Sequence, residues 1–377
     1  MNVLINCSNL KTGGALQVAD SICHELYKYE QHDFTIVASD ALINSLDDLQ
    51  KTPNLKILNY NFKNNFHALL YGRDTYLDSI EKKNNISAVL TLFGPISWIP
   101  KSVHICGFAR GQLLLSDSPF YTRMKPLERF FKKIHNFILS YYFQRGVNVF
   151  FTENEFITEK WKHLVKNAKV FTITNFYNQV FDRKNEWQNI KLPKFDGKTF
   201  LCITSYYKHK NLEIAIDVAK SLLKINSSFK FRFVFTISED EYPIVPESLK
   251  RNFLFLGKVS ISECPSLYTQ ANVMFQPTLM ECFTATYPEA MKMEVPIVTT
   301  DLEFAHGLCG NAALYYKALD AHDAARILYN LCNDKKLCLD LIVKGKQQLL
   351  KYDSYEQRAS KLIKIIEEQK YGRNETF

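Results

Sequence analysis

The chain has 377 residues, more than one hydrophobic core usually organises, so two domains are expected. Hydrophobic residues make up 46% of it and charged residues 23%, a composition that is ordinary for a globular protein and excludes a disordered chain. The formal net charge of +8 favours anionic partners such as phosphates or an acidic membrane face. Composition alone, however, favours basic side chains that are simply spread over a solvated surface.

Nine cysteines are present, an odd number at irregular spacings and without any Cys-x-x-Cys pair. Several lie in apolar runs, as Cys202 does. This pattern predicts buried free thiols in a reducing cytosol and argues against a disulfide framework or a zinc site. The first residues are typical of a strand and not of a signal peptide. No apolar run reaches the ~18 residues of a membrane-spanning helix, so a cytoplasmic location is expected.

Short apolar runs alternate with longer amphipathic stretches in the first half of the chain. The expected strands are Val3–Asn6, Phe34–Ala38, Leu55–Leu58, Ala88–Leu92, Val103–Phe108, Val147–Thr152 and Val170–Ile173. The clearest helical pattern covers Ala15–Tyr29. Alternating strands and helices predict a mainly parallel sheet with helices on both faces.

The same alternation restarts in the second half. The expected strands are Thr199–Thr204, Phe231–Phe235, Phe253–Leu256, Val273–Gln276, Ile297–Thr300 and Ala313–Tyr316. A helix is expected over Asn211–Lys224, with Asn211 as its N-cap. The chain is therefore predicted to be an α/β protein with two doubly wound, Rossmann-like domains.

A weakly periodic stretch rich in Asn, Pro, Asp and Gly separates the two series. It predicts an amino-terminal domain over 1–180, a linker over 181–198 and a second domain over 199–353. A charged amphipathic helix within 354–377 is expected to pack back on the amino-terminal domain. The alternative is a long surface loop within one domain, but the fresh buried strand that follows directly favours a linker.

The most informative string is residues 276–300, which are typical of a strand, a loop, a helix and a second strand. Thr284 is the expected cap of a helix that begins at Ala285. A loop that enters a helix presents free backbone N–H groups, which suit a phosphate. Glu281 before the helix and Glu289 inside it suit sugar hydroxyls, because carboxylates make charge-assisted hydrogen bonds. Two such glutamates alone would still be read as solvated side chains.

The whole string resembles the E-x7-E signature of family 4 glycosyltransferases. The matching residues are Glu281, Phe283, Glu289, Ala290, Met291, Pro296, Ile297 and Val298. The resemblance implies a GT-B fold, with two domains facing a cleft, and a retaining transfer reaction. It also implies that Glu281 contacts the donor sugar and Glu289 the ribose. By the same resemblance, the backbone of Cys282, Phe283 and Thr284 cradles the sugar and the diphosphate.

Three positions depart from this signature. Thr284 and Glu294 stand where the family has glycines, and Lys292 replaces a small residue. A helix end often needs a positive φ, which glycine adopts freely and glutamate does not. The helix is therefore expected to end differently here, and Thr284 is expected either to narrow the donor pocket or to add a hydroxyl contact.

A basic turn, residues 204–211, lies between a strand and the helix that Asn211 is expected to cap. Lys210 would then sit at a helix N-terminus, where its charge helps to hold a phosphate. The family has an Arg and a Lys near here. Lys210 matches the Lys, whereas the Arg position holds Ser205, and Lys208 is the candidate replacement. Alone, this segment would be read as a solvated basic turn.

Two further candidates lie in the first half. Gly13 and Gly14, directly after the first strand, allow a close backbone approach and resemble a family loop that faces the diphosphate and the acceptor. Many family members have a histidine after a strand in this half. His104 lies inside an apolar run and is more typical of a core histidine, so Arg110, at the end of that run, is the preferred cleft residue.

Together with the resemblance to family 4, these residues predict a retaining glycosyltransferase with Glu281, Lys210 and Arg110 as its catalytic residues. No Asp-x-Asp string with the right context occurs, so neither a metal ion nor another cofactor is expected; the nucleotide-sugar is a substrate. The expected acceptor is a glycan or a polyprenyl-linked glycan in bacterial surface polysaccharide synthesis, and nucleic acid is not an expected partner. A sugar-nucleotide epimerase and a non-catalytic sugar-nucleotide-binding module remain the alternatives.

A basic and aromatic stretch covers Phe120–Arg145, where Glu128 is the one acidic residue. As a helix with exposed aromatics it would lie on an anionic membrane face, which makes a peripheral position on the inner membrane face a second expectation for location. Equally, its aromatics could fill the core of the first domain while its basic groups are solvated. The sequence leaves both interpretations open.

Overall fold

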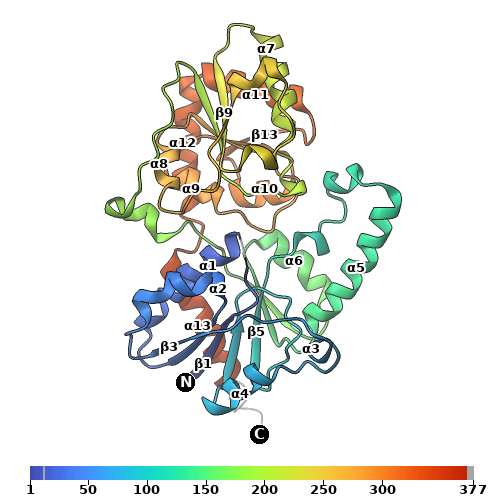
Figure 1. The fold of residues 1–377 in the computed structure, drawn as a ribbon, viewed down its shortest axis with the longest axis vertical. Coiled ribbons are helices and arrows are strands. Elements are labelled where there is room, and N and C mark those ends of the chain that lie inside the picture. Colours follow the sequence, from blue (N-terminus) through green and yellow to red (C-terminus); the bar gives the residue numbers. More distant parts are fainter. Residues whose placement is uncertain (12, 372–377) are drawn as a thin grey trace. The chain divides into compact units, whose positions relative to one another are not determined.

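The computed structural model of the protein describes residues 1–11 and 13–371. The chain divides into two compact units. The first contains Met1–Leu114, Lys125–Asn175 and the chain from Asp353 onward, and the second contains Leu115–Met124 and Phe176–Tyr352. Each unit has its own parallel sheet, so the two α/β domains expected from the sequence are present (Figure 1).

The sheet of the first unit has seven strands in the order β3-β2-β1-β4-β5-β6-β7, all parallel. In chain order they are β1 (Asn2–Cys7), β2 (Asp33–Ala38), β3 (Leu55–Asn59), β4 (Ala88–Thr91), β5 (Val103–Phe108), β6 (Val149–Thr152) and β7 (Lys169–Thr172). The helices of this unit are α1 (Gly14–Cys23), α2 (Asp40–Ile43), α3 (Phe66–Tyr71), α4 (Thr75–Lys83), α5 (Pro126–Gln144), α6 (Glu155–Leu164) and α13 (Tyr355–Tyr371).

Side chains that alternate along β1 fill two different cores. Val3 and Ile5 pack with residues of α1 and α13, whereas Leu4 packs with residues of α3 and α4. Because successive strand side chains point to opposite faces, this alternation places helices on both faces of the sheet. The carboxyl-terminal helix thus packs in the core of the first unit, through Leu362 and Ile366 among others.

The sheet of the second unit has six parallel strands in the order β10-β9-β8-β11-β12-β13. In chain order they are β8 (Lys198–Cys202), β9 (Phe231–Phe235), β10 (Phe253–Phe255), β11 (Val273–Gln276), β12 (Ile297–Thr300) and β13 (Ala313–Tyr316). The helices are α7 (Ile214–Ile225), α8 (Cys264–Tyr268), α9 (Thr286–Lys292), α10 (Glu303–Cys309), α11 (Ala321–Asn333) and α12 (Lys335–Leu349).

The second sheet is also covered on both faces. Phe200 packs with α7 and α11, and Leu201 packs with α8, α9 and α10. Short 3-10 helices join the main elements of both units: Leu26–Lys28, Asn44–Leu49, Gly111–Leu113, Pro119–Arg123, Gln179–Asp182, Lys184–Glu186, Lys208–Lys210, Glu239–Glu241 and Glu247–Asn252.

The unit boundaries differ from the expected ones in two places. The stretch expected as a linker over 181–198 packs within the second unit, where Phe181 and Leu192 are core residues. The short segment Leu115–Met124 also joins the second unit, although the chain around it belongs to the first. No pattern in the sequence separates these ten residues from their neighbours, because their packing partners lie far along the chain.

Two local predictions are corrected by the structure and a third is confirmed. The helix expected over Ala15–Tyr29 ends at Cys23 and is followed by the separate 3-10 helix Leu26–Lys28. The helix expected from Asn211 begins only at Ile214. All nine cysteines are free, as predicted; seven are buried and the other two, Cys332 and Cys338, are partly buried.

Candidate active site

The strand order of the second sheet reverses between β8 and β11. The chain runs outward from β8 through β9 to β10 on one side, and then returns to β11, β12 and β13 on the other. In doubly wound sheets, ligands bind outside the carboxyl ends of the strands at such a switch point. The basic turn follows β8 and the glutamate string follows β11, so the topology brings together the two segments that the sequence singled out.

Lys210 and Glu281 meet at this point. The Lys210 Nζ donates to Glu281 Oε1 at 2.5 Å, and the Thr278 hydroxyl donates to the same oxygen at 2.8 Å. Glu281 is only 9% exposed, so the pair is largely shielded from water. Within the described residues, Glu281 Oε2 makes no hydrogen bond. Lys210 Nζ carries three N–H donors, and one of them donates to Glu281.

The backbone joins the two loops as well. The Leu279 N–H donates to the His209 carbonyl at 2.8 Å. His209 itself stacks on Tyr207, with ring centroids 5.6 Å apart, and lies close enough to Glu281 for the two to interact electrostatically. Burial lowers the pKa of His209, so its imidazole favours the neutral form. Both loops therefore hold one another in place at the switch point.

The local geometry of the basic turn differs from the expectation. Lys210 ends a 3-10 helix and does not stand at the N-terminus of α7. Asn211 is not the N-cap; it adopts a left-handed conformation at φ 53° and is buried. Asn is one of the few residues that tolerates this conformation, and a reversal here separates the 3-10 turn from α7. The turn aims Lys210 at Glu281 instead of along a helix axis.

The turn before α9 also corrects the expected cap. Helix α9 begins at Thr286, and the Thr284 hydroxyl pairs with the Thr286 hydroxyl at 2.9 Å instead of capping the helix. Within the described part of the chain, the amide N–H groups of Phe283 and Thr284 donate no hydrogen bond. Phe283 is half-buried against Tyr352, with ring centroids 6.1 Å apart. The turn thus keeps backbone donors beside Glu281.

Glu289 lies on α9 and is buried, with 3% of its surface exposed. The Tyr268 hydroxyl donates to its Oε2 at 3.0 Å. Burial raises the pKa of Glu289 to about 7, and the bond from Tyr268 only partly offsets this. An ionisable group held near neutrality by burial is typical of functional sites, although structural carboxylates also show it.

Helix α9 ends at a position where the signature that the chain resembles has a glycine, but where this chain has Glu294. Glu294 itself adopts the positive φ, at 58°. Its N–H donates to Met291 and the next N–H, of Val295, donates to Ala290, which satisfies the last helical carbonyls. Glu294 is exposed and pairs with Lys346 at 2.7 Å. The helix therefore ends as it would with glycine, and the expectation of a different end was wrong.

The other residues of the second unit that were expected to bind the donor lie on the loops that carry Lys210 and Glu281. Ser205 and Lys208 are exposed in the loop after β8. Lys208 opens the 3-10 turn that Lys210 closes. Cys282 is buried directly after Glu281. The structure thus places Ser205, Lys208 and Cys282 on the same loops as the Lys210–Glu281 pair.

Three other candidates belong to the first unit. Gly13 adopts φ 81° and precedes α1, where only glycine is comfortable, and Gly14 opens the helix. The adjoining Thr12 lies outside the described residues. Arg110 is exposed two residues after β5 and lies near enough to Lys132 of α5 to lower the pKa of that amine, after burial. Their roles toward the donor stay predictions.

His104 is a core histidine, as its apolar neighbours indicated. It is 1% exposed, and its ring contacts the Thr91 hydroxyl at 2.9 Å and the Gly146 carbonyl at 3.2 Å. Burial lowers its pKa to about 4, which keeps the ring neutral.

Four residues of the candidate site were missed in the sequence. Thr278 supports Glu281, Tyr268 supports Glu289, and His209 joins the loops. Arg123, from the segment Leu115–Met124, donates to the Asn211 side chain at 2.5 Å and pairs with Glu213 at 2.9 Å. Thr278 and His209 stood inside the two strings that the sequence had marked for the donor. Arg123 stood in the stretch Phe120–Arg145, marked only for a membrane face, and Tyr268 stood in no marked string.

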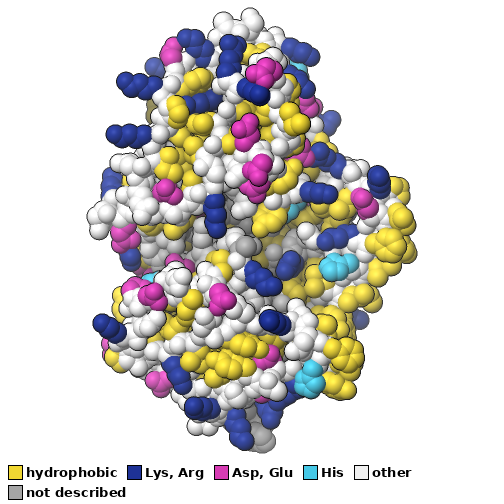
Figure 2. Space-filling model, viewed as in Figure 1, with side chains coloured by type: hydrophobic (Ala, Val, Ile, Leu, Met, Phe, Trp, Pro, Cys, Tyr) yellow, Lys and Arg dark blue, Asp and Glu magenta, His cyan; other side chains and the backbone are white. Residues whose placement is uncertain are grey.

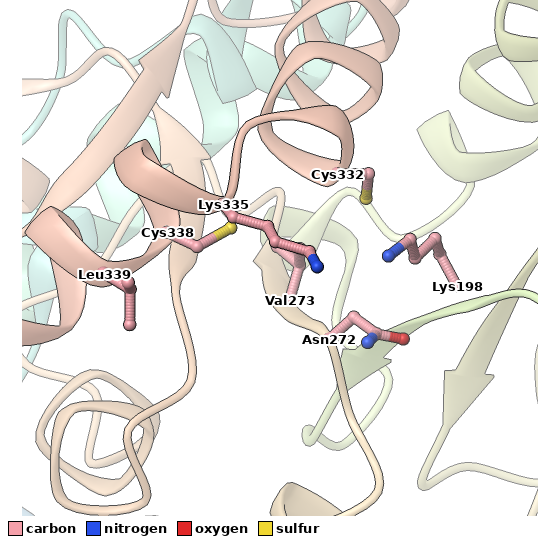
Figure 3. Close-up of a pocket in the computed structure, with 7 residues that line it drawn as sticks. All are labelled: Lys198, Asn272, Val273, Cys332, Lys335, Cys338 and Leu339. Atoms are coloured by element: carbon pink, nitrogen blue, oxygen red, sulfur yellow. The ribbon is translucent and has the colours of Figure 1, made fainter.

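A cavity of about 260 Å³ lies elsewhere in the second unit (Figure 3). Lys198 and Lys335 point toward each other across it, beside Asn272 and Val273. Lys198 opens β8 and Val273 opens β11, so this cavity is at the amino ends of the strands. Because the strands are parallel, it lies at the edge of the sheet opposite the Lys210–Glu281 pair and is not part of the candidate site.

The sequence of the second unit is similar to that of known proteins. Residues 183–348 match the model of the family described as glycosyl transferases group 1. The chain is also 25% identical over 240 residues to the O-antigen chain mannosyltransferase RfbU of Salmonella typhimurium. That match covers 60% of this chain and 62% of RfbU, less than two thirds of either.

Solved structures show the fold. A glycosyltransferase from Rickettsia africae superposes with a TM-score of 0.70 at 16% identity, covering 97% of this chain and 98% of that one. A Listeria monocytogenes protein named as a UDP-N-acetylglucosamine 2-epimerase has a TM-score of 0.61 at 11% identity, covering 98% and 96%. At these identities the likeness establishes the two-domain GT-B fold alone. Residues 183–348 are thus similar to group 1 glycosyl transferases, which belong to the transferase class of enzymes.

Proposed function

We propose that the protein is a retaining glycosyltransferase that moves a sugar from a nucleotide-sugar donor to a glycan or a polyprenyl-linked acceptor. Bacterial surface polysaccharide synthesis, as in O-antigen, capsule or lipopolysaccharide assembly, is the proposed setting, because the curated relative is named for O-antigen synthesis. The donor is proposed to bind at the switch point of the second sheet, and the reaction is proposed to need no metal ion.

The observation that carries this proposal is the pair formed by Lys210 and Glu281. A cation and an anion are held at 2.5 Å, largely buried, outside the carboxyl ends of β8 and β11. Among the residues that the structure describes, two N–H donors of Lys210 and Oε2 of Glu281 have no partner and are free for a ligand. Together they suit a ligand that is anionic at one end and hydroxylated at the other, as the diphosphate and the sugar of such a donor are.

The chemistry follows from these groups. In the transfer, the bond between the sugar's anomeric carbon and the diphosphate oxygen breaks, and a bond to the acceptor oxygen forms on the same face. The acceptor proton passes to a departing phosphate oxygen. Lys210 and the N–H groups of Phe283 and Thr284 would stabilise the charge that grows on the diphosphate. Glu281 Oε2 would orient the sugar by accepting from a hydroxyl.

The test is a donor screen on the purified chain. A panel of GDP- and UDP-sugars, with a mannose donor first, is incubated with and without a polyprenyl-diphosphate-linked glycan. Nucleoside diphosphate release and the anomeric configuration of the product are then measured. Acceptor-dependent release with retained configuration supports the proposal. An inverted product contradicts retention, and activity that is lost with chelator and restored by a divalent cation contradicts independence from metal.

Matched variants tie the activity to the site. Glu281→Gln is expected to lose turnover by about 100-fold or more, because it removes a group that acts on the reacting sugar. Glu294→Gln, an exposed glutamate on the same string, serves as the control and is expected to keep full activity. Equal losses in both variants would remove Glu281 from the site.

The alternative that shares this fold is a sugar-nucleotide epimerase, as the Listeria likeness illustrates. Such an enzyme needs no acceptor and changes the configuration of the donor sugar itself. Nuclear magnetic resonance of the donor without acceptor separates the two. An epimerised donor would favour the alternative, and an unchanged donor together with acceptor-dependent release would favour the transferase. A chain that binds donors without either change would be a non-catalytic binding module.

A further inference from the structure

Helix α5, in the first unit, exposes a stripe of large hydrophobic side chains. Of its 19 residues only Phe143 is buried. The exposed members are Leu127 (66%), Phe130 (57%), Phe131 (60%), Ile134 (43%), Phe137 (79%), Ile138 (50%) and Tyr141 (61%). The sequence left open whether these aromatic side chains fill the core of the first domain. Their exposure shows that they do not.

These side chains share one face of the helix. They recur every three or four residues, the spacing that aligns positions on an α-helix. At ~1.5 Å per residue the helix is about 28 Å long, so the stripe is long as well as apolar. The opposite side of α5 faces the protein, where Phe143 packs on Phe108 and Asn136 donates to the Gln112 carbonyl at 2.7 Å.

Helix α3 extends this apolar face. Phe66, Leu70 and Tyr71 are 78%, 50% and 60% exposed. Arg145, at the end of α5, donates to the Leu69 and Leu70 carbonyls at 2.6 and 2.9 Å and so holds the two helices together. Figure 1 shows α3 beside one end of α5, and Figure 2 shows hydrophobic side chains gathered over α5 and again below it. We call the exposed apolar residues of α3 and α5 the α3–α5 surface.

Basic side chains accompany this surface. Arg129 and Lys133 are exposed on α5, Lys132 is partly buried there, and Lys125 precedes the helix. Glu128 is the one acidic residue of α5. A helix with a wide apolar face and a basic polar face is typical of helices that lie in the interface of an anionic bilayer. Within residues 1–11 and 13–371, no helix is long and apolar enough to cross a membrane.

We propose that the α3–α5 surface docks the first unit on an anionic lipid bilayer, with the aromatic residues of α5 among the acyl chains and its basic residues at the headgroups. A second copy of the chain fits the surface less well. Packing two such stripes together would cover the apolar side chains but give Arg129, Lys132 and Lys133, which lie away from the stripe, no anionic groups to face. An anionic bilayer complements both the apolar and the basic part.

This proposal does not depend on the proposed transfer reaction, since it concerns binding to lipid alone. The test uses the whole chain and two kinds of vesicle, phosphatidylglycerol mixed with phosphatidylcholine and phosphatidylcholine alone. Flotation measures the bound fraction at low and high salt. Wild type is expected to bind the anionic vesicles and to lose most of that binding at high salt, because screening removes the headgroup attraction.

Two double variants separate the two contributions. Phe130→Gln with Phe137→Gln is expected to weaken binding to anionic vesicles by at least about tenfold, since it removes two inserted rings. Arg129→Gln with Lys133→Gln is expected to weaken it by roughly 30-fold and to reduce its salt dependence. Leu350→Gln, which changes an 87% exposed leucine outside the surface, is the matched control and should bind as wild type does.

A direct probe reports insertion. In a Phe137→Trp variant the indole fluorescence is expected to shift to shorter wavelength on anionic vesicles, whereas a Leu350→Trp variant should show no shift. The proposal is overturned if wild type does not bind anionic vesicles. It is also overturned if the phenylalanine variant binds as well as wild type does, or if wild type forms a dimer that this variant abolishes while neither binds lipid.

Discussion

The Tyr268 hydroxyl donates a 3.0 Å hydrogen bond to Oε2 of Glu289, and both side chains are buried inside the second unit. Burial raises the pKa of the Glu289 carboxyl to about 7, against 4.5 for an exposed one. The pair therefore keeps an ionisable group at a position where a neutral one would be easier to bury. The unfavourable free energy of burying this carboxyl is explained if the group binds a ligand.

The first prediction concerns stability against pH. The raised pKa means that the folded state binds more protons than the unfolded state between about pH 4.5 and about pH 7. The free energy of unfolding from this group therefore falls as pH rises through that window, by up to about 3 kcal/mol, and stays level above it.

Glu289→Gln removes the titration, so the variant's stability relative to wild type should rise between about pH 4.5 and about pH 7. Urea unfolding at several pH values measures this difference. Glu294→Gln changes an exposed glutamate and should follow wild type throughout. If Glu289→Gln also runs parallel to wild type, the carboxyl is not the buried, shifted group that the structure describes.

A second prediction tests the proposed ribose contact of Glu289. A carboxylate can accept from both ribose hydroxyls, whereas an amide offers a single acceptor oxygen. Glu289→Gln should cost about 1–3 kcal/mol of donor binding. With a 2′-deoxyribose donor the loss should largely vanish, because the partner hydroxyl is already absent. Calorimetry over this double cycle measures the coupling, and additive losses would make Glu289 a structural residue that serves Tyr268.

Much of the fold could be predicted because its signals are local. Each strand expected in the sequence is present, within two residues at either end. Buried parallel strands such as Phe231–Phe235 are continuous apolar runs, and their flanking helices follow a regular spacing. The unit boundaries were less predictable. Leu115–Met124 joins the second unit through contacts such as that of Ser118 with the Leu279 carbonyl, 161 residues away.

The candidate site was predictable where a residue stood in a recognisable string. Lys210 and Glu281 are 71 positions apart, yet the resemblance marked both, and strand order explains why they meet. Backbone details were not predictable in the same way. Asn211 looked like a cap because Asn is a common N-cap, but it is also one of the few residues that adopts the left-handed conformation found here.

A third prediction concerns Lys210 and the diphosphate. Lys210→Ala should weaken binding of a nucleoside diphosphate by about 1.5–3 kcal/mol, the usual value of a charge-assisted contact, and leave binding of the bare nucleoside nearly unchanged. Calorimetry with both ligands measures the difference. Lys220→Ala, which removes an exposed lysine of α7 that pairs with Asp217, is the control and should affect neither. Unchanged diphosphate affinity in Lys210→Ala would take Lys210 out of the donor site.

A fourth prediction concerns the end of α9. Glu294 adopts φ 58°, which costs a non-glycine residue about 1–2 kcal/mol. Glu294→Gly should relieve this and raise the free energy of unfolding by about 1 kcal/mol, even though it loses the exposed ion pair with Lys346. Glu294→Ala keeps the strained conformation and loses the pair, so it should be no more stable than wild type. Equal stabilities of the Gly and Ala variants would contradict this account.

The last prediction concerns Arg123 as a positioning residue. Its guanidinium donates to Asn211 at 2.5 Å and pairs with Glu213 at 2.9 Å, and Asn211 directly follows Lys210. Arg123 thus holds the left-handed turn that aims Lys210 at Glu281. Arg123→Ala should free Asn211 and lower kcat/KM for transfer by about tenfold, the effect of losing roughly 1.4 kcal/mol of charge-assisted hydrogen bonding.

Two comparisons separate positioning from a general loss of stability. One nitrogen of the guanidinium, Nη1, contacts both Asn211 and Glu213. Arg123→Lys keeps the charge and places its three donors on one nitrogen, so it should recover part of the activity, but not all, because the lysine side chain is one bond shorter. Arg326→Ala breaks an exposed ion pair with Asp323 on α11 and should leave kcat/KM unchanged. Because Arg123 acts through Lys210, its loss should be small in a Lys210→Ala background. If the two losses simply add, Arg123 does not work through that lysine.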